Sequence, residues 1–282
     1  MNMRAAWIGL IGVLWAIAAL PPSAHAQEAR AANPRVTRMA EDAAQSFMWV
    51  GNSFFYYNNG MPVLVQRLLA GGPPQEFRPY RATMIAISGS GLAWHDLESE
   101  LRPDAVGRYS FDADNNIVFN TDAKLFDVVI MMDCSQCPIH PTLGKIFPDI
   151  VRTDARIARA HGAEPVLFMS WAYADKPEMT ADLAAAYTAV GNANNALVIP
   201  AGLAFARVRT EHPNIVLYQP DNRHPTMAGT YLAAATSLVT LYHRPIEENS
   251  FTAGLDTDTA RILRRTAWET VLAYFGSSFA EK

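Results

Sequence analysis

Residues 126–132 read FDVVIMM, and residues 165–169 read PVLFM. Both runs are apolar at nearly every position, whereas a strand with one face in water alternates apolar and polar side chains. Runs of this kind are typical of parallel strands that helices cover on both faces. They therefore predict two central strands, 126–132 and 165–170, of an α/β domain.

Helical and strand-like segments alternate along the rest of the chain, on both sides of these two runs. This alternation favours a mainly parallel sheet in one domain that spans residues 46–282. We find no internal repeat and no Pro/Ser-rich linker that would divide it. The other expected strands are 46–50, 83–87, 196–200 and 215–218; the expected helices are 61–69, 92–101, 147–161, 181–194, 203–211, 226–242 and 256–274; residues 110–120 are expected to form a hairpin or an insertion.

The first 26 residues have the pattern of a secretory signal peptide. Arg4 supplies a positive charge, residues 5–20 are apolar and uncharged, and residues 24–26 read AHA, a cleavage sequence of small residues. Cleavage after Ala26 predicts a periplasmic or extracellular protein that begins with a loose leader, residues 27–45. The alternative is an uncleaved membrane anchor. No other stretch is long and apolar enough to span a membrane.

The composition excludes several classes of protein. The chain has 282 residues, is 50% hydrophobic, and carries 23 Lys and Arg against 27 Asp and Glu. It is too apolar for a disordered chain and lacks the basic excess of a nucleic-acid binder. No phosphate-binding loop follows a strand and no complete set of metal ligands is present, so we expect neither cofactor nor metal.

Reactive side chains follow two of the predicted strands, at the end where ligands bind in parallel sheets. Ser53 comes directly after the strand 46–50, and Asp221 and His224 come after the strand 215–218. A histidine held by an aspartate can take the proton of a serine and so make it a nucleophile. Taken alone, the Ser53 block fits an ordinary serine near a turn better than a nucleophile. The Asp221–His224 pair fits a capped turn with a surface histidine equally well.

Together the two blocks resemble the SGNH/GDSL hydrolase superfamily. Residues 50–54 read VGNSF and residues 221–234 read DNRHPTMAGTYLAA. They are most similar to the branch whose first block reads G-N-S-F. The resemblance implies a three-layer α/β/α, flavodoxin-like fold and a serine esterase or acylhydrolase that works through an acyl-enzyme. It makes Ser53 the nucleophile, His224 the base and Asp221 the partner that orients the histidine.

The same resemblance implies an oxyanion hole built from Ser53 and a glycine of residues 87–91. We expect this glycine to be Gly89, with Gly91 as the alternative. The family's third block carries an asparagine that is absent here, since residues 133–138 read DCSQCP. Ser135 stands at its place, and we expect the amide of Gln136 to act instead. A weakly active, ligand-binding protein of the same fold is therefore an alternative function.

Other residues are candidates for substrate binding or for a disulfide. Asn52, Trp94 and Trp171 are expected to line the substrate cleft, although each aromatic residue could simply be packed. Cys134 and Cys137 are expected to form a small disulfide that shapes the third block, with thiol–disulfide chemistry or metal binding as alternatives. A secreted location and the branch resembled favour a small-molecule or carbohydrate ester, in particular an acylated carbohydrate.

Overall fold

Five parallel strands form the central sheet of this α/β protein, in the order β2-β1-β5-β6-β7. The two runs FDVVIMM and PVLFM contribute the interior strands β5 and β6, as their composition predicts. The strands are β1 Ser46–Gly51, β2 Arg81–Ala86, β5 Val128–Met131, β6 Glu164–Phe168 and β7 Leu197–Ile199.

The computed structural model describes residues 33–40, 44–73, 79–121, 124–276 and 279. All of them belong to one compact unit, residues 31–282. The predicted signal peptide and most of the predicted leader lie outside the described residues. No helix in the described part of the chain is both long and apolar enough to cross a membrane.

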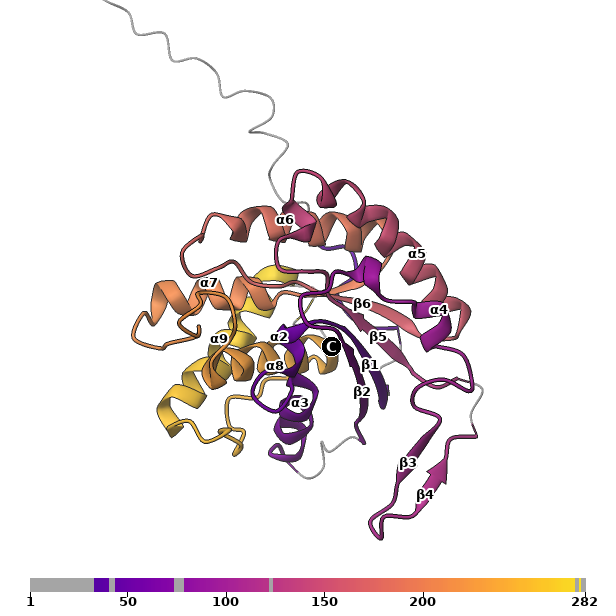
Figure 1. The fold of residues 1–282 in the computed structure, drawn as a ribbon. Coiled ribbons are helices and arrows are strands. Elements are labelled where there is room, and N and C mark those ends of the chain that lie inside the picture. The colour runs from indigo at the N-terminus through magenta and orange to yellow at the C-terminus, as the bar shows by residue number, and fades with distance from the viewer. Residues whose placement is uncertain (1–32, 41–43, 74–78, 122–123, 277–278, 280–282) are drawn as a thin grey trace, which may run out of the picture. The chain divides into compact units, whose positions relative to one another are not determined.

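Helices cover both faces of the sheet (Figure 1). The alternation of side chains along β1 shows why both layers are needed: Phe47 and Trp49 enter one hydrophobic core, and Met48 and Val50 enter the other. Helices α3 Met61–Ala70, α7 Ala201–Glu211, α8 Met227–Tyr242 and α9 Thr257–Phe275 contribute to the first core; α4 Leu97–Glu100, α5 Phe147–Ala160 and α6 Met179–Ala193 contribute to the second.

The winding of the chain reverses between β1 and β5. The chain passes from β1 outward to β2, and then returns to build β5, β6 and β7 on the other side of β1. Neighbouring strands end at matching positions, since Gly51 pairs with Ala86 and Val50 with Met131. Such a reversal leaves a crevice beyond the carboxyl ends of the strands, where doubly wound proteins bind ligands.

Two expected elements differ in the structure. Residues 215–218 do not join the sheet as a strand; Tyr218 makes a single antiparallel bridge with Pro225, because this segment pairs with the loop that follows it. The expected helix 92–101 is divided into a 3-10 turn, Leu92–Trp94, and the short helix α4. Asp96 caps the N-terminus of α4, because its Oδ1 accepts the N–H of Ser99.

Short elements complete the fold. A one-turn helix, α2 Ser53–Tyr56, follows β1 directly. The expected hairpin at 110–120 is confirmed as strands β3 Tyr109–Phe111 and β4 Ile117–Phe119. Two further 3-10 turns, Cys137–Ile139 and Leu143–Lys145, lie between β5 and α5.

Candidate active site

Ser53, His224 and Asp221 form a connected row of polar groups. The Oγ of Ser53 lies 2.9 Å from the Nε2 of His224, and the Nδ1 of His224 lies 2.5 Å from Oδ2 of Asp221. A carboxylate only accepts hydrogen bonds, so Nδ1 carries the proton that is donated to Asp221. Nε2 is then left with a lone pair that accepts the hydroxyl proton of Ser53. This is the arrangement by which a histidine activates a serine.

Ser53 lies just beyond the carboxyl end of β1, two residues after the last residue of the strand. Asn52 caps α2, and its Oδ1 accepts the N–H of Phe54. Ser53 is therefore the first residue of a helix, where backbone N–H groups lack an acceptor in the preceding turn. Gly51 allows this sharp turn, because a Cβ at that position would lie 2.9 Å from the ring of Phe55.

A tight loop between residues 217 and 226 holds His224 and Asp221. The N–H of Thr226 donates to Leu217 O at 2.9 Å, and the N–H of Gln219 donates to His224 O at 2.8 Å. Oδ1 of Asp221 accepts the backbone N–H groups of Arg223 and His224 at 3.0 and 2.9 Å. Asp221 thus fixes both the backbone and the ring of the histidine.

The hydrogen bonds of Asp221 also keep it ionised. Burial raises the pKa of the carboxyl group, but hydrogen bonds from the His224 side chain and from the backbone of His224 and Arg223 outweigh it. The pKa falls to about 2 as a result. The group is therefore a carboxylate at neutral pH and can stabilise an imidazolium at His224.

Aromatic side chains surround the imidazole ring of His224. Tyr57 stacks on it with ring centroids 4.3 Å apart and planes 10° apart. Phe54 meets its edge at 5.7 Å. Tyr57 did not emerge from the sequence as a site residue. The only sequence signal for it was its position one turn after Ser53, before the turn of residues 58–60.

Trp171 does not line the cleft as expected. Its side chain is fully buried and stacks between Phe54 and Phe205, with centroid distances of 4.5 and 4.2 Å. Its Nε1–H donates to the carbonyl of Arg223 at 2.9 Å. Trp171 therefore supports the loop of His224 from within the core.

Asn52 also differs from the expectation. It is buried, and its amide donates to the carbonyls of Ser90 and Asp133 at 3.0 and 3.3 Å. Asn52 thus ties the loops after β1, β2 and β5 together instead of facing the cleft. Trp94, by contrast, is 66% exposed in the turn after β2, where it can contact a ligand.

The buried carboxylate of Asp133 joins the loops after β2 and β5. Its Oδ1 accepts the N–H of Leu92 at 2.9 Å and that of Cys134 at 2.8 Å. Burial raises its pKa, although these two hydrogen bonds oppose the shift. Gly91 allows the close approach, because a Cβ there would lie 2.6 Å from Oδ1.

The expected oxyanion donors lie on these loops. Within the described part of the chain, neither the N–H of Ser53, nor that of Gly89, nor the amide of Gln136 makes a hydrogen bond to the protein. Gly89 is exposed with φ +73°, a conformation that favours glycine. Ser135 donates to or accepts from the hydroxyl of Tyr173 at 2.7 Å. Gln136 is therefore the side chain of this loop that retains a free amide.

Cys134 and Cys137 form the expected disulfide. It closes the loop after β5, and a Cβ at Gly91 would lie 3.4 Å from the Sγ of Cys137. Among the described residues, Asp133, Cys134 and Cys137 gather possible metal-binding atoms within 4.8 Å of one another. Because both sulfurs are bonded to each other, neither is a thiolate that could bind zinc.

A second group of titratable side chains, His95, Glu100 and Asp154, lies near the carboxyl end of β1. The Nε2–H of His95 and the hydroxyl of Ser90 both donate to the carbonyl of Gly51, at 3.1 and 2.9 Å. The Nδ1 of His95 lies 3.7 Å from Oε1 of Glu100. Burial raises the pKa of the nearby Asp154 to about 7, against the opposing effect of His95. His95 thus holds the last residue of β1 in place, two residues before Ser53.

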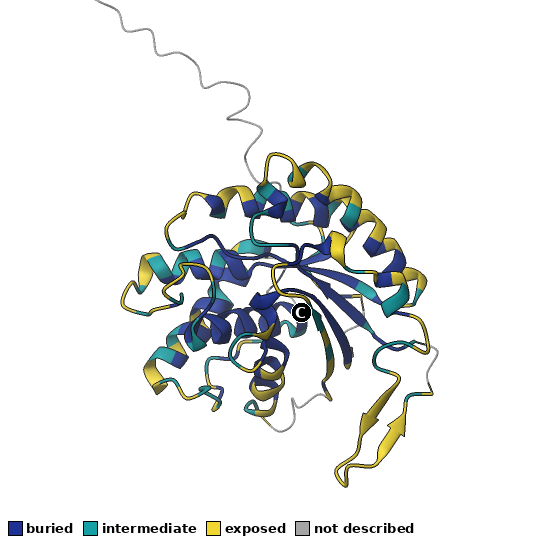
Figure 2. Cartoon of the chain, viewed as in Figure 1, coloured by how far each residue is buried: buried dark blue, intermediate teal, exposed yellow. Residues whose placement is uncertain are grey.

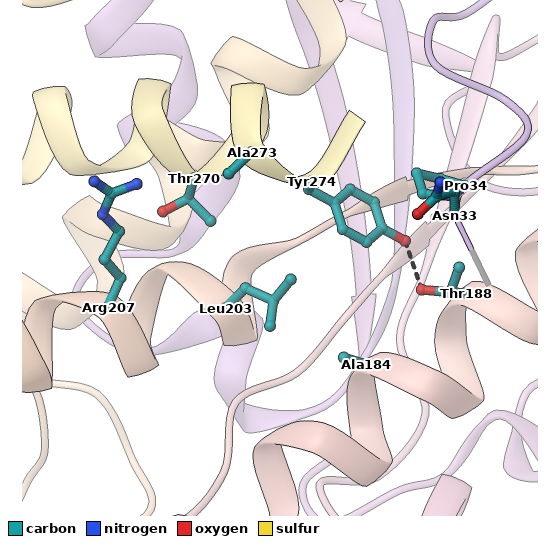
Figure 3. Close-up of a pocket in the computed structure, with 9 residues that line it drawn as sticks. All are labelled: Asn33, Pro34, Ala184, Thr188, Leu203, Arg207, Thr270, Ala273 and Tyr274. Atoms are coloured by element: carbon teal, nitrogen blue, oxygen red, sulfur yellow. Dashed lines mark hydrogen bonds between the residues drawn. The ribbon is translucent and has the colours of Figure 1, made fainter. Parts of the chain in front are cut away.

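The structure also contains a cavity of about 400 Å³ among α6, α7 and α9 (Figure 3). No residue of the Ser53–His224–Asp221 row lines it. Two of its polar side chains are paired: the hydroxyl groups of Tyr274 and Thr188 lie 2.8 Å apart, and Arg207 binds Glu269, outside the lining, at 2.6 Å. The buried hydroxyl of Thr270 has no hydrogen-bond partner among the described residues. We assign this cavity no catalytic role.

Comparison with solved structures shows which proteins share this fold. A DUF4886 family protein from Bacteroides uniformis has a TM-score of 0.56 at 18% identity, covering 82% of this chain and 96% of its own. A candidate SGNH hydrolase from Slackia heliotrinireducens has a TM-score of 0.50 at 23% identity, covering 70% and 98%. A single-substitution variant of Axe2, an acetyl-xylooligosaccharide esterase from Geobacillus stearothermophilus, has a TM-score of 0.50 at 16% identity, covering 73% and 95%.

No family model matches the sequence, and no curated protein matches it either. The similarity to solved structures is thus one of fold, an α/β arrangement with a mainly parallel sheet that SGNH hydrolases also have. This confirms the fold class expected from the two sequence blocks.

Proposed function

We propose that the protein is a serine ester hydrolase. The observation that carries this proposal is the row Ser53–His224–Asp221, with its two short contacts of 2.9 and 2.5 Å. The row lies beyond the carboxyl ends of the strands, in a fold that solved esterases also have. Hydrolase activity fits both the geometry and the fold.

In the proposed mechanism, the Oγ of Ser53 attacks the carbonyl carbon of the ester while Nε2 of His224 takes its proton. The negative charge that develops on the carbonyl oxygen is held by the N–H groups of Ser53 and Gly89 and by the amide of Gln136. His224 then gives the proton to the leaving alcohol, and the acyl group stays on Ser53. Water, deprotonated by His224, releases the acid and restores the serine.

The proposed substrate class is an acylated carbohydrate or another small ester. The signal-peptide pattern of residues 1–26 supports a periplasmic or extracellular location. Axe2 is described as acting on acetylated xylo-oligosaccharides. The exposed ring of Trp94, next to the loop of Gly89, is suited to packing against a sugar.

Hydrolysis of a short-chain aryl ester such as 4-nitrophenyl acetate tests the proposal. We expect Ser53→Ala to lower kcat at least ~10³-fold, because the nucleophile is lost. Ser110→Ala, an exposed serine in β3, serves as the matched control and is expected to leave the rate unchanged. Equal rates for Ser53→Ala and the unmodified chain would refute the proposal.

The altered third block favours one competing function, a binding protein that keeps the cleft and turns over poorly. Loss of an oxyanion donor can lower the rate by ~10²-fold or more. If Gln136 does act as the donor, Gln136→Ala is expected to lower kcat by about that factor with little change in KM. A chain that binds acetylated oligosaccharides without hydrolysing them or any aryl ester would favour the binding protein.

A further inference from the structure

One face of the β3–β4 hairpin is made entirely of large apolar side chains. The antiparallel register pairs Tyr109 with Phe119 and Phe111 with Ile117, which places these four residues on the same face. Their exposed fractions are 55%, 61%, 63% and 56% in the same order. The opposite face carries Ser110 and Val118. The hairpin therefore presents an uncovered apolar surface.

This surface is separate from the candidate active site. The hairpin lies in the chain between α4 and β5, so it approaches the sheet at the amino end of β5, whereas Ser53 follows the carboxyl end of β1. Figures 1 and 2 show it projecting from the domain and exposed along both strands. A two-stranded ribbon has no core of its own, and exposed apolar patches on soluble proteins mark interaction surfaces.

Charge is distributed unevenly along the hairpin. Arg108 lies at its base, where it pairs with Asp104 and stands 6.0 Å over the ring of Phe119. Asp112 and Asp114 lie at its tip, and Oδ1 of Asp112 accepts the N–H groups of Asp114 and Asn116. The arginine is thus beside the apolar face at one end, and the acidic groups are at the other.

We propose that the hairpin is a dimerisation arm that packs its apolar face against the same face of a second copy of this chain. Among the two-fold arrangements of these faces, we infer the one in which the hairpins run antiparallel, because a parallel arrangement would place Arg108 against Arg108 and one acidic tip against the other. The base of each hairpin then faces the tip of the other, and Arg108 of each copy meets Asp114 of its partner. The apolar faces and the charges are both complementary in this one arrangement.

The angles between the rings disfavour a sugar chain as the partner of this face, and the acidic tip disfavours an anionic membrane. Tyr109 meets Phe111 at 90° and Phe119 at 67°, so the rings do not form the flat platform on which a sugar chain stacks. The acidic tip would be repelled by an anionic lipid surface, which attracts basic segments. A second hairpin, whose side chains interdigitate with tilted rings, suits this face better.

The size of the surface sets the strength of the expected dimer. Four large side chains from each copy would bury on the order of 1,000 Å² in total, at the lower end of specific interfaces. We therefore expect a reversible dimer with a dissociation constant in the ~1–100 µM range.

Sedimentation velocity of the purified chain across this concentration range tests the proposal. Phe111→Thr/Phe119→Thr removes two rings from the apolar face while keeping residues that favour strands. We expect it to weaken the dimer at least ~10-fold, and to leave ester hydrolysis per chain unchanged because the site is distant. Val118→Thr, on the opposite face, is the matched control and is expected to leave the dimer intact.

A charge exchange tests the antiparallel arrangement. Arg108→Glu and Asp114→Arg each place like charges together in a homodimer, so each variant alone is expected to be monomeric. An equimolar mixture restores opposite charges at both contacts and is expected to give a heterodimer. A chain that stays monomeric at ~100 µM would overturn the proposal, as would a dimer that the double threonine variant does not weaken. So would binding of the hairpin face to polysaccharide or to anionic vesicles instead.

Discussion

The Oγ of Ser53 and the Nε2 of His224 lie 2.9 Å apart, although 171 residues separate them in the chain. Ser53 follows an interior strand of the sheet, and His224 lies in the loop before α8. Their contact therefore depends on the whole parallel sheet and on the helix layer that covers it. The predictions below test whether this contact performs the chemistry that its geometry allows.

Asp221→Asn is expected to lower kcat by roughly 10²- to 10⁴-fold with a small change in KM. The amide can still receive the backbone N–H groups, but it cannot hold the His224 proton as a carboxylate does. Steady-state kinetics with an aryl acetate measures this. Asp258→Asn, an exposed residue at the start of α9, is the control. Full activity in Asp221→Asn would show that the aspartate does not orient the base.

Tyr57→Ala is expected to lower kcat/KM by about tenfold, because the aromatic face that holds the His224 ring is lost. Tyr57→Phe keeps the stacked ring and is expected to retain nearly full activity. The comparison separates the ring from the hydroxyl group. Equal loss in both variants would mean that the tyrosine acts through its hydroxyl and not through stacking.

Cys134→Ser/Cys137→Ser is expected to reduce the free energy of unfolding by only about 2 kcal/mol. A disulfide that closes a loop this short constrains the unfolded chain less than one that closes a long loop. We expect ester hydrolysis to persist at a reduced rate, because Asp133 still ties this loop to that after β2. Urea unfolding and aryl ester kinetics measure the two effects. An insulin-reduction assay provides the contrast: activity there that vanishes in the double variant would instead support a thiol–disulfide protein.

Asp154→Asn is expected to change how stability depends on pH. Burial raises the pKa of Asp154 from 3.8 to about 7 in the folded chain. The folded state thus keeps a proton that the unfolded state loses above pH 3.8, so this contribution to stability is lost as the pH rises to about 7.

The amide that replaces the Asp154 carboxyl group in this variant cannot ionise. Relative to the unmodified chain, the Tm of the variant is therefore expected to rise by ~5 °C between pH 4 and pH 8. Asp149→Asn, an exposed residue of the same helix, is the control and is expected to show no such trend. A constant Tm difference across this range would contradict the account of Asp154.

The central features of the fold could be predicted from the sequence. The runs FDVVIMM and PVLFM indicate covered strands because side chains on both faces are apolar. The segment 215–218 was wrongly expected to be a strand, because hydrophobicity alone does not show whether a segment pairs with the sheet or with a nearby loop. Likewise, residues 92–101 read as one helical segment, and the break before α4 depends on a hydrogen bond from the N–H of Ser99 to Asp96 that the hydrophobic pattern does not show.

The candidate site could be predicted only in part. Ser53, Asp221 and His224 carry recognisable chemistry at strand ends, and the structure brings them together. The roles of Tyr57 and Asp133 could not be found in this way, because each acts through contacts with residues far along the chain. Trp171 shows the converse: an aromatic residue just past a strand can belong to the core as readily as to a cleft.

Reaction of the folded chain with a fluorophosphonate tests the central claim most directly, because only an activated serine attacks this reagent. We predict a single adduct by intact-mass spectrometry, mapped by peptide sequencing to Ser53, and its absence from His224→Asn and from denatured protein. No adduct on the folded chain, or an adduct at another serine, would contradict the account.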